Sequence, residues 1–404
     1  MIRSFAPLLA GALLALAAPA PAEGEVPAAP VPVEGEVPAA PAPAPAPTTP
    51  TPAGSGASTR DVDLVVCLDT SGSMEGLIDA ARKKLWDVCA LLAQARPTPR
   101  LRVALLQYGC DAASESGHVV RVSDLTTDLD GVYERLVALR ASGGDERVGR
   151  VLHEALRGLS WSPSRDAVRV ILVAGNESAD QDPEHPFRQL AGQALQRNAV
   201  VHAIHCARGG EPLDEVQGWR DLARCGGGEF GQITLDQASI QIETPYDAEL
   251  VRLNTALNHT YVPYGRGGVE GQRRQEAQDR NASRWGGLSS LAGRATCKAE
   301  SVYTNAGWDL VDAEQQPDFE WSQLDPADLP ESLRGLPVPV ARAKLAEVRA
   351  RRRAIQAQVK ALSALRQKAI EEALAARRGE AARTLDQALL AAIKKQGTHS
   401  GLSW

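Results

Sequence analysis

Residues 63–74, which read Asp-Leu-Val-Val-Cys-Leu-Asp-Thr-Ser-Gly-Ser-Met, constrain the fold more than any other stretch of the chain. An apolar run of strand length ends at Asp69, and Ser71 and Ser73 follow before a helical pattern from about Glu75 to Leu92. This pattern predicts a buried strand that ends in a loop of oxygen ligands. Carboxylate and hydroxyl oxygens suit Mg²⁺, Mn²⁺ or Ca²⁺ better than softer metals. We therefore expect a metal site at this loop; the alternative is a loop in which Asp69 only caps the helix.

Strand-like and helix-like patterns alternate along the chain after this stretch. The strand patterns cover residues 101–108, 118–122, 167–174, 199–206 and 229–234, and the helical patterns cover 129–141, 146–159, 185–197 and 215–224. Such alternation predicts a doubly wound, mostly parallel α/β sheet with helices on both faces. In sheets of this class, ligands bind outside the carboxyl ends of the strands, where the strand order reverses.

Asp69, Ser71 and Ser73 match the Asp-x-Ser-x-Ser signature of the metal-ion-dependent adhesion site, and the chain resembles the von Willebrand factor type A family. The resemblance implies a Rossmann-like fold in which the strands ending at Asp69 and near Ala174 flank the reversal of strand order. It also implies a divalent cation, Mg²⁺ before Mn²⁺ or Ca²⁺, and a protein partner that is bound through an acidic group. A bacterial exported branch of the family, which carries no firm biochemical activity, shows further similarity at 219–221, 249–264, 275–279 and 308–313.

Two loops depart from the family's usual pattern. The second loop typically supplies a threonine, but residues 143–146 read Gly-Gly-Asp-Glu, with Asp145 at the corresponding position. The third loop typically supplies an aspartate, but Gly175 stands in its place. We expect the metal ligands to be Asp69, Ser71, Ser73 and Asp145, with Asn176 or Glu177 contributing through water. The additional carboxylate should weaken the attraction of the metal for an acidic partner.

The amino-terminal region predicts export. Residues 1–22 carry one early positive charge, an apolar core and a small-residue cleavage site, which is typical of a secretory signal peptide. Residues 23–59 are dominated by Pro and Ala, and this composition predicts a disordered tether. We expect a periplasmic or secreted protein without an integral membrane span. The rest of the chain should form a type A domain over 60–246, a mixed extension packed on it over 247–337, and a helical region over 338–396.

The helical region contains an apolar three-four stripe, which predicts a helix from Ala341 to about Arg378. A second helix is expected over 381–395. We favour a hairpin folded on itself or against the rest of the chain, because sustained heptads are missing; the alternative is an intermolecular coiled coil and hence self-association. The basic run at Arg349 and 351–353 is interpreted as a solvated face. With a formal net charge of −6, the chain is a poor candidate for binding nucleic acid.

Candidate catalytic groups are few. His202, His205 and Cys206 lie near the end of one predicted strand, but alternation places the side chains of His205 and Cys206 on opposite faces. The chain has no Gly-x-Ser-x-Gly elbow and no His-Glu-x-x-His helix. The hypothesis of a hydrolase that uses Glu177 as a base beside the metal is therefore the least favoured. We also hypothesise a disulfide bond between Cys206 and Cys225.

The sequence as a whole favours an exported protein-binding or adhesion module that uses a divalent metal, and we do not expect an enzyme. The alternative is a metal-independent structural or scaffold protein of the cell envelope, in which Asp69, Ser71 and Asp145 only brace loops. Metal binding by these residues is the property that distinguishes the two interpretations.

Overall fold

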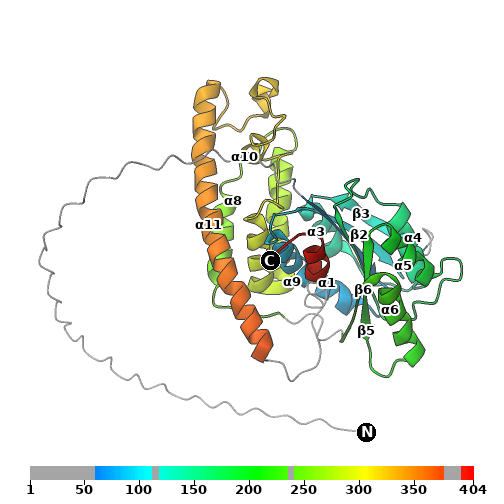
Figure 1. Cartoon of the computed structure of the whole chain (residues 1–404). Helices are drawn as coiled ribbons and strands as arrows, with labels where there is room; N and C mark the ends of the chain where they lie inside the picture. Colours follow the sequence, from blue (N-terminus) through cyan, green and yellow to red (C-terminus); the bar gives the residue numbers. More distant parts are fainter. Residues whose placement is uncertain (1–59, 112–117, 235–240, 377–392) are drawn as a thin grey trace, which may run out of the picture. The chain divides into compact units, whose positions relative to one another are not determined.

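The central element is a six-stranded sheet with the strand order β3-β2-β1-β4-β5-β6 (Figure 1). The computed structural model describes residues 60–111, 118–234, 241–376 and 393–404, which belong to one compact unit. The strands are β1 (Asp61–Asp69), β2 (Arg100–Tyr108), β3 (Val119–Thr126), β4 (Val168–Gly175), β5 (Ala199–Ala207) and β6 (Gly227–Thr234). Only β2 and β3 pair antiparallel. The predicted mostly parallel α/β sheet is confirmed, whereas the predicted signal peptide (1–22) and tether (23–59) lie outside the described residues.

Helices cover both faces of the sheet because the central strand β1 is apolar on both sides. Its side chains alternate between the two faces: Leu64 and Leu68 enter one core, and Val65 and Cys67 enter the other. Helices α1 (Glu75–Ala93) and α3 (Leu129–Ala138) cover the first face. The second face is covered by α4 (Val148–Arg157), α5 (Phe187–Gln196) and α6 (Leu213–Cys225).

Strand β1 lies between β2 and β4, so the strand order reverses at its carboxyl end. In the register, Asp69 stands beside Tyr108 of β2, and Leu68 stands beside Ala174 of β4. The loops that follow β1 and β4 therefore begin at neighbouring points of the same sheet edge. This is the position at which ligands of doubly wound sheets bind.

The first extension after the sheet consists of α8 (Asp247–Asn258) and α9 (Gly268–Lys298), and α9 packs along α1. Helix α9 reaches Lys298 through a kink at Gly286 and Gly287. After the kink, the helix buries charged groups beside its apolar residues. The Arg294 guanidinium pairs with Asp130 of α3 at 2.5 Å, and the Lys298 ammonium lies 3.4 Å from Asp279.

The second extension comprises the short α10 (Leu310–Ala313), two 3₁₀ turns, η1 (Trp321–Gln323) and η2 (Pro326–Asp328), and the long α11 (Val338–Ala376). Helix α11 packs on α8, α9 and α10 of the same chain (Figure 1). Most of the expected second helix lies in residues 377–392, outside the described residues, and 393–399 are helical. Self-association stays a prediction.

The interpretation of the basic run as a wholly solvated face is wrong for Arg352. This residue is only 4% exposed, and its guanidinium donates to Asp309 at 2.6 Å and to Asp312 at 2.8 Å. It also donates to the hydroxyl of Thr260 at 3.0 Å. Hydrogen bonds to two carboxylates offset the cost of burying the charge, so Arg352 anchors α11 to the α10 region.

The hypothesised disulfide bond is also wrong, since Cys206 and Cys225 are both free thiols. Cys206 points into the core under α1, whereas Cys225 packs against the core on the opposite face of the sheet. Cys206 lies near the end of a strand and Cys225 ends the next helix along the chain, but the sheet separates their two side chains.

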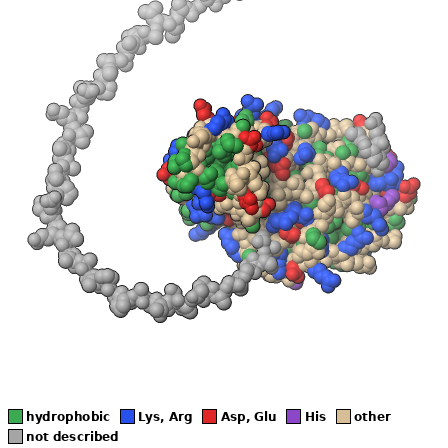
Figure 2. Space-filling model, turned by 90° about the horizontal axis from the view of Figure 1, so that it is seen from above, with side chains coloured by type: hydrophobic (Ala, Val, Ile, Leu, Met, Phe, Trp, Pro, Cys, Tyr) green, Lys and Arg blue, Asp and Glu red, His purple; other side chains and the backbone are tan. Residues whose placement is uncertain are grey.

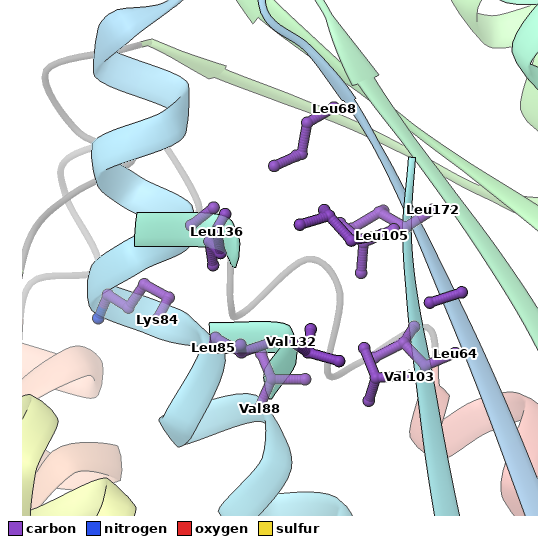
Figure 3. Close-up of a pocket in the computed structure, with 13 residues that line it drawn as sticks. Leu64, Leu68, Lys84, Leu85, Val88, Val103, Leu105, Val132, Leu136 and Leu172 are labelled. Atoms are coloured by element: carbon purple, nitrogen blue, oxygen red, sulfur yellow. The ribbon is translucent and has the colours of Figure 1, made fainter. Parts of the chain in front are cut away.

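The core under α1 is incompletely filled. A cavity of about 40 Å³ lies between α1, α3 and the sheet, and its lining is almost entirely apolar. Figure 3 shows Val132 and Leu136 of α3 facing Leu64, Val103 and Leu105 of the strands across it. The cavity is small for a metabolite, so we regard it as a packing defect.

The surface of the described residues shows no large patch of a single charge in the view of Figure 2, where acidic and basic side chains are intermixed. Hydrophobic side chains gather at the end of the second extension, near the start of α11, which points up in Figure 1. Val338 and Val340, at the start of α11, are among the exposed apolar residues. No helix in the described ranges is long and apolar enough to cross a bilayer.

Candidate metal centre

The end of β1 forms a tight turn around the carboxylate of Asp69, which is fully buried. The backbone N–H of Ser71 donates to Asp69 Oδ1 at 2.8 Å. The Thr70 hydroxyl donates to the carbonyl of Tyr108 at 3.1 Å, and the N–H of Met74 donates to the carbonyl of Ser71 at 2.9 Å. These bonds hold the turn in place before α1 begins at Glu75.

Three oxygens around this turn are buried and have no hydrogen-bond partner among the described residues. They are Asp69 Oδ2, Ser71 Oγ and Asn176 Oδ1. Asn176 follows β4, and its side-chain N–H donates to Ser73 Oγ at 2.9 Å, so the loop after β4 is tied to the loop after β1. Buried polar atoms normally have partners, because an unsatisfied one costs about 1–3 kcal/mol. The donor set of carboxylate, hydroxyl and amide oxygens fits a hard divalent cation.

Glycine at position 175 is explained by the crowding around Asp69. A Cβ atom on Gly175 would lie 2.5 Å from the hydroxyl oxygen of Tyr108 and 3.1 Å from Asp69 Oδ2. The Tyr108 hydroxyl donates to the carbonyl of Ala174 at 3.0 Å and so fills the space beside this position. An aspartate cannot be accommodated there without displacing Tyr108, so the third loop cannot supply the family's usual ligand from this position.

The structure places Asp145 outside the site and its neighbour Glu146 inside it. The side chain of Asp145 is 63% exposed and pairs with Arg147 at 3.1 Å. Glu146 is only 8% exposed. A Cβ atom on Gly109 would lie 2.7 Å from Asp69 Oδ1 and 3.2 Å from the Cγ of Glu146, so both side chains border the same point.

The sequence contained both acids side by side but no signal that chose between them. The choice depends on the course of the loop before α4, which turns Glu146 inward. Of the expected ligands, Asp69 and Ser71 share the buried turn, Ser73 is exposed and accepts a hydrogen bond from Asn176, and Asp145 faces solvent. Glu146 is the residue that the sequence interpretation missed.

Burial and neighbouring charges disfavour ionisation in this crevice. Burial raises the pKa of Asp69 to about 7, and the charge of Glu146 adds to this effect. Burial and the charge of Glu177 raise the pKa of Glu146. A cluster of carboxylates that resists ionisation would be stabilised in its ionised form by a bound cation.

Glu177 lies at the rim of the crevice. Its carboxylate accepts a hydrogen bond from the side chain of Gln181 at 3.0 Å and lies 3.6 Å from the guanidinium of Arg208. The carbonyl of Glu177 accepts from the indole of Trp219 at 2.7 Å, which fixes the backbone of the loop. The third carboxylate is therefore positioned by other side chains and is accessible to solvent.

The histidine and cysteine groups near the end of β5 do not form a catalytic pair. His205 contacts Glu215 at 3.3 Å on one face of the sheet, and Cys206 packs in the core on the other. His202 accepts a hydrogen bond from the N–H of Glu229 at 3.0 Å, and burial lowers its pKa to about 4. Burial also raises the pKa of the Cys206 thiol, which disfavours a nucleophilic thiolate.

Comparison with known proteins gave only structural similarities. No protein-family model matches the chain, and no curated protein matches it. Among solved structures, the chain is similar to the VWA domain of SpRpn10, with 16% identity and a TM-score of 0.33 over 44% of this chain and 89% of that one. It is also similar to proximal thread matrix protein 1 from the mussel byssus, with 11% identity and a TM-score of 0.35 over 44% of this chain. Another structure of that protein, with a zinc-occupied MIDAS motif, has 12% identity, a TM-score of 0.36 and 45% coverage of this chain. The matched region spans 43% of the mussel protein.

Proposed function

We propose that this protein is an exported protein-binding or adhesion module that recognises its partner with the help of a divalent cation held at the carboxyl end of β1. The observation that carries the proposal is the group of three buried oxygens without partners, Asp69 Oδ2, Ser71 Oγ and Asn176 Oδ1, at the point where the strand order reverses. A hard cation is a ligand that suits carboxylate, hydroxyl and amide oxygens of this kind.

Each residue of the site has a distinct role in this proposal. Asp69 supplies the buried negative charge, and Ser71 and Ser73 supply neutral oxygens. Glu146 takes the place that the sequence suggested for Asp145, and Asn176 ties the β4 loop to the site. Mg²⁺ is the metal we favour, because the donors are oxygens; Mn²⁺ and Ca²⁺ share this preference for oxygen.

A metal held in this way could bind an acidic group of a partner protein. An incoming carboxylate would replace water on the metal, and the amino-terminal end of α1 adds a favourable field for an anion. The carboxylates of Glu146 and Glu177 act against this attraction. We therefore expect modest intrinsic affinity, which display of several copies on the amino-terminal tether would increase.

Metal titration with matched variants tests the proposal. Saturating Mg²⁺ should raise the stability of the wild-type protein, by about 2.7 kcal/mol at a metal concentration one hundred times the dissociation constant. Asp69→Ala and Glu146→Ala should lose most of this stabilisation, and Asp145→Ala should keep it. Equal stabilisation of all four proteins would place the cation elsewhere.

The competing function is that of a metal-independent scaffold of the cell envelope. The observation that favours it is that Asp69 Oδ1 already accepts the N–H of Ser71, as a loop-bracing carboxylate would. Crosslinking to envelope proteins with and without chelator separates the two. Partners that are the same in chelator and with Asp69→Ala would support the scaffold, and partners lost under both conditions would support metal-assisted recognition. No catalytic role is proposed.

A further inference from the structure

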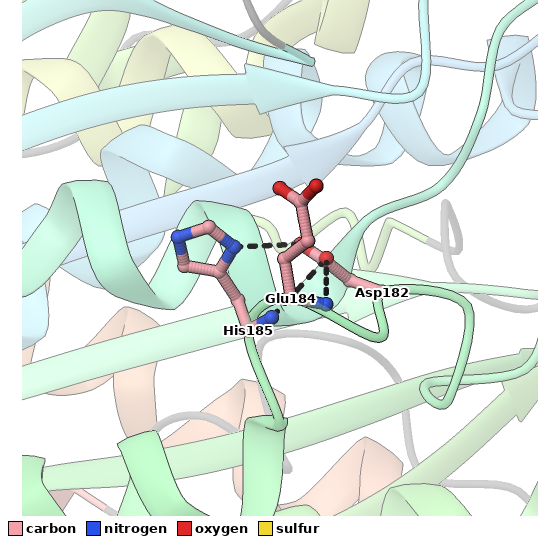
Figure 4. A group of neighbouring side chains, drawn as sticks. All are labelled: Asp182, Glu184 and His185. Atoms are coloured by element: carbon pink, nitrogen blue, oxygen red, sulfur yellow. Dashed lines mark hydrogen bonds and ion pairs between the residues drawn. The ribbon is translucent and has the colours of Figure 1, made fainter.

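A second group of potential metal ligands lies further along the loop between β4 and α5. The ligand atoms of Asp182, Glu184 and His185 all lie within 4.8 Å of one another (Figure 4). The backbone N–H groups of Glu184 and His185 donate to Asp182 Oδ1 at 3.1 and 3.2 Å. These two bonds fold the loop over the buried side chain of Asp182. The other carboxylate oxygen, Oδ2, lies 3.4 Å from His185 Nδ1.

A second imidazole, that of His153 on α4, packs against the ring of His185. The rings of His153 and His185 contact each other edge to face, with centroids 4.8 Å apart. Gly149 makes this approach possible, since a Cβ atom there would lie 1.7 Å from the carbonyl oxygen of His185. His153 follows Gly149 by four residues and so lies on the same face of α4. The glycine thus allows the helix to bring its histidine against the loop.

Two imidazoles and two carboxylates form a donor set that suits zinc and neighbouring transition metals. Around a tetrahedral zinc with bonds of about 2.0–2.1 Å, ligand atoms lie ~3.3 Å apart. Asp182 Oδ2 and His185 Nδ1 already have this separation. We propose that Asp182, Glu184 and His185, whose ligand atoms already lie together, bind a transition-metal dication of the zinc class, and that the ring of His153 turns to supply the fourth ligand. This site is independent of the Asp69 centre, whose donors are all oxygens.

Arg150 supplies the positive charge at this cluster in the metal-free protein. Its guanidinium lies 3.4 Å from Asp182 Oδ2 and 2.5 Å from Glu184 Oε2. Arg150 is on α4 beside Gly149, and its side chain is 23% exposed, so it can swing toward solvent. A bound dication has to displace this guanidinium from the two carboxylates. Arg150 therefore lowers the affinity of the site, and its removal should raise it.

The test is a titration of the full, untagged chain with Zn²⁺ by calorimetry and with Co²⁺ by visible absorption, which is sensitive to tetrahedral coordination. One zinc should bind to the wild-type protein and to Asp69→Ala. His185→Ala and His153→Ala should lower the affinity at least about tenfold, and His399→Ala, at an exposed histidine, should leave it unchanged. Arg150→Gln should bind zinc more tightly than the wild type, and Arg157→Gln, on the same helix, should not.

The outcomes separate the proposal from its competitors. Loss of zinc binding in Asp69→Ala, with retention in His185→Ala, would assign the metal to the other centre and overturn the proposal. Absence of zinc binding in both the wild type and Arg150→Gln would show that the four residues form only an ion-pair cluster. Weaker binding in Arg150→Gln would contradict the displacement of the guanidinium. Far-ultraviolet circular dichroism of each variant establishes that it is folded.

Discussion

Replacement of Asp69 by asparagine should stabilise the metal-free protein at high pH. Burial raises the pKa of this carboxyl from its ordinary value of 3.8 to about 7. Between these two values the folded protein binds a proton that the unfolded chain has released, so the stability of the wild type falls as the pH rises through this window. The difference between these two pKa values corresponds to roughly 4 kcal/mol, since a tenfold change in proton affinity is worth about 1.4 kcal/mol. Asparagine is nearly isosteric, cannot ionise, and can keep the hydrogen bond from Ser71.

The assay is urea unfolding in chelator, followed by the fluorescence of the protein's seven tryptophans. At pH 8, Asp69→Asn should be more stable than the wild type by up to roughly 4 kcal/mol, and the difference should shrink as the pH approaches 4. Asp145→Asn is the matched control, because that side chain is 63% exposed and should change stability little. Saturating Mg²⁺ should stabilise the wild type and leave Asp69→Asn unchanged, so that the advantage of the variant narrows or reverses.

Two results would refute this reasoning. If Asp69→Asn were no more stable than the wild type at pH 8 in chelator, burial would not be opposing the ionised carboxylate. If the difference between the two proteins did not depend on pH, the stabilisation would have another origin. Either result would also remove the electrostatic argument for a cation at this position.

Three further predictions concern the packing and a buried ion pair of the folded chain. Gly175→Ala should destabilise the protein by about 1–3 kcal/mol in urea unfolding, because the new methyl group would lie 2.5 Å from the Tyr108 hydroxyl; unchanged stability would show that Tyr108 moves freely. Arg352→Ala should cost about 3–5 kcal/mol by the same measurement, because it leaves Asp309 buried without its partner; a cost below about 1 kcal/mol would contradict that role. Val132→Ile adds a methylene group beside the 40 Å³ cavity and should raise the free energy of unfolding by up to about 1 kcal/mol. A lower free energy of unfolding would show that the cavity cannot accept the group.

The sequence alone determined the fold class and the location of the first candidate site. The alternation of apolar strands with amphipathic helices requires a wound sheet, because each apolar face has to be covered. The apolar run that ends at Asp69 places its carboxylate at the carboxyl end of a buried strand. Ser71 and Ser73 come directly after it in the chain, so their place in the following loop is also predictable. These features depend on residues that are neighbours in the chain, so pattern and spacing suffice to predict them.

Tertiary structure decided what depends on residues distant in sequence. Whether Asp145 or Glu146 faces Asp69 depends on how the loop before α4 crosses the sheet edge, and the two adjacent acids give no local signal. Gly175 owes its identity to Tyr108 on another strand. Arg294 and Arg352 look like solvated charges until their buried partners, Asp130 and Asp309, are known. A charge is buried only where folding supplies its counter-ion, and such pairs join parts of the chain that no sequence periodicity connects.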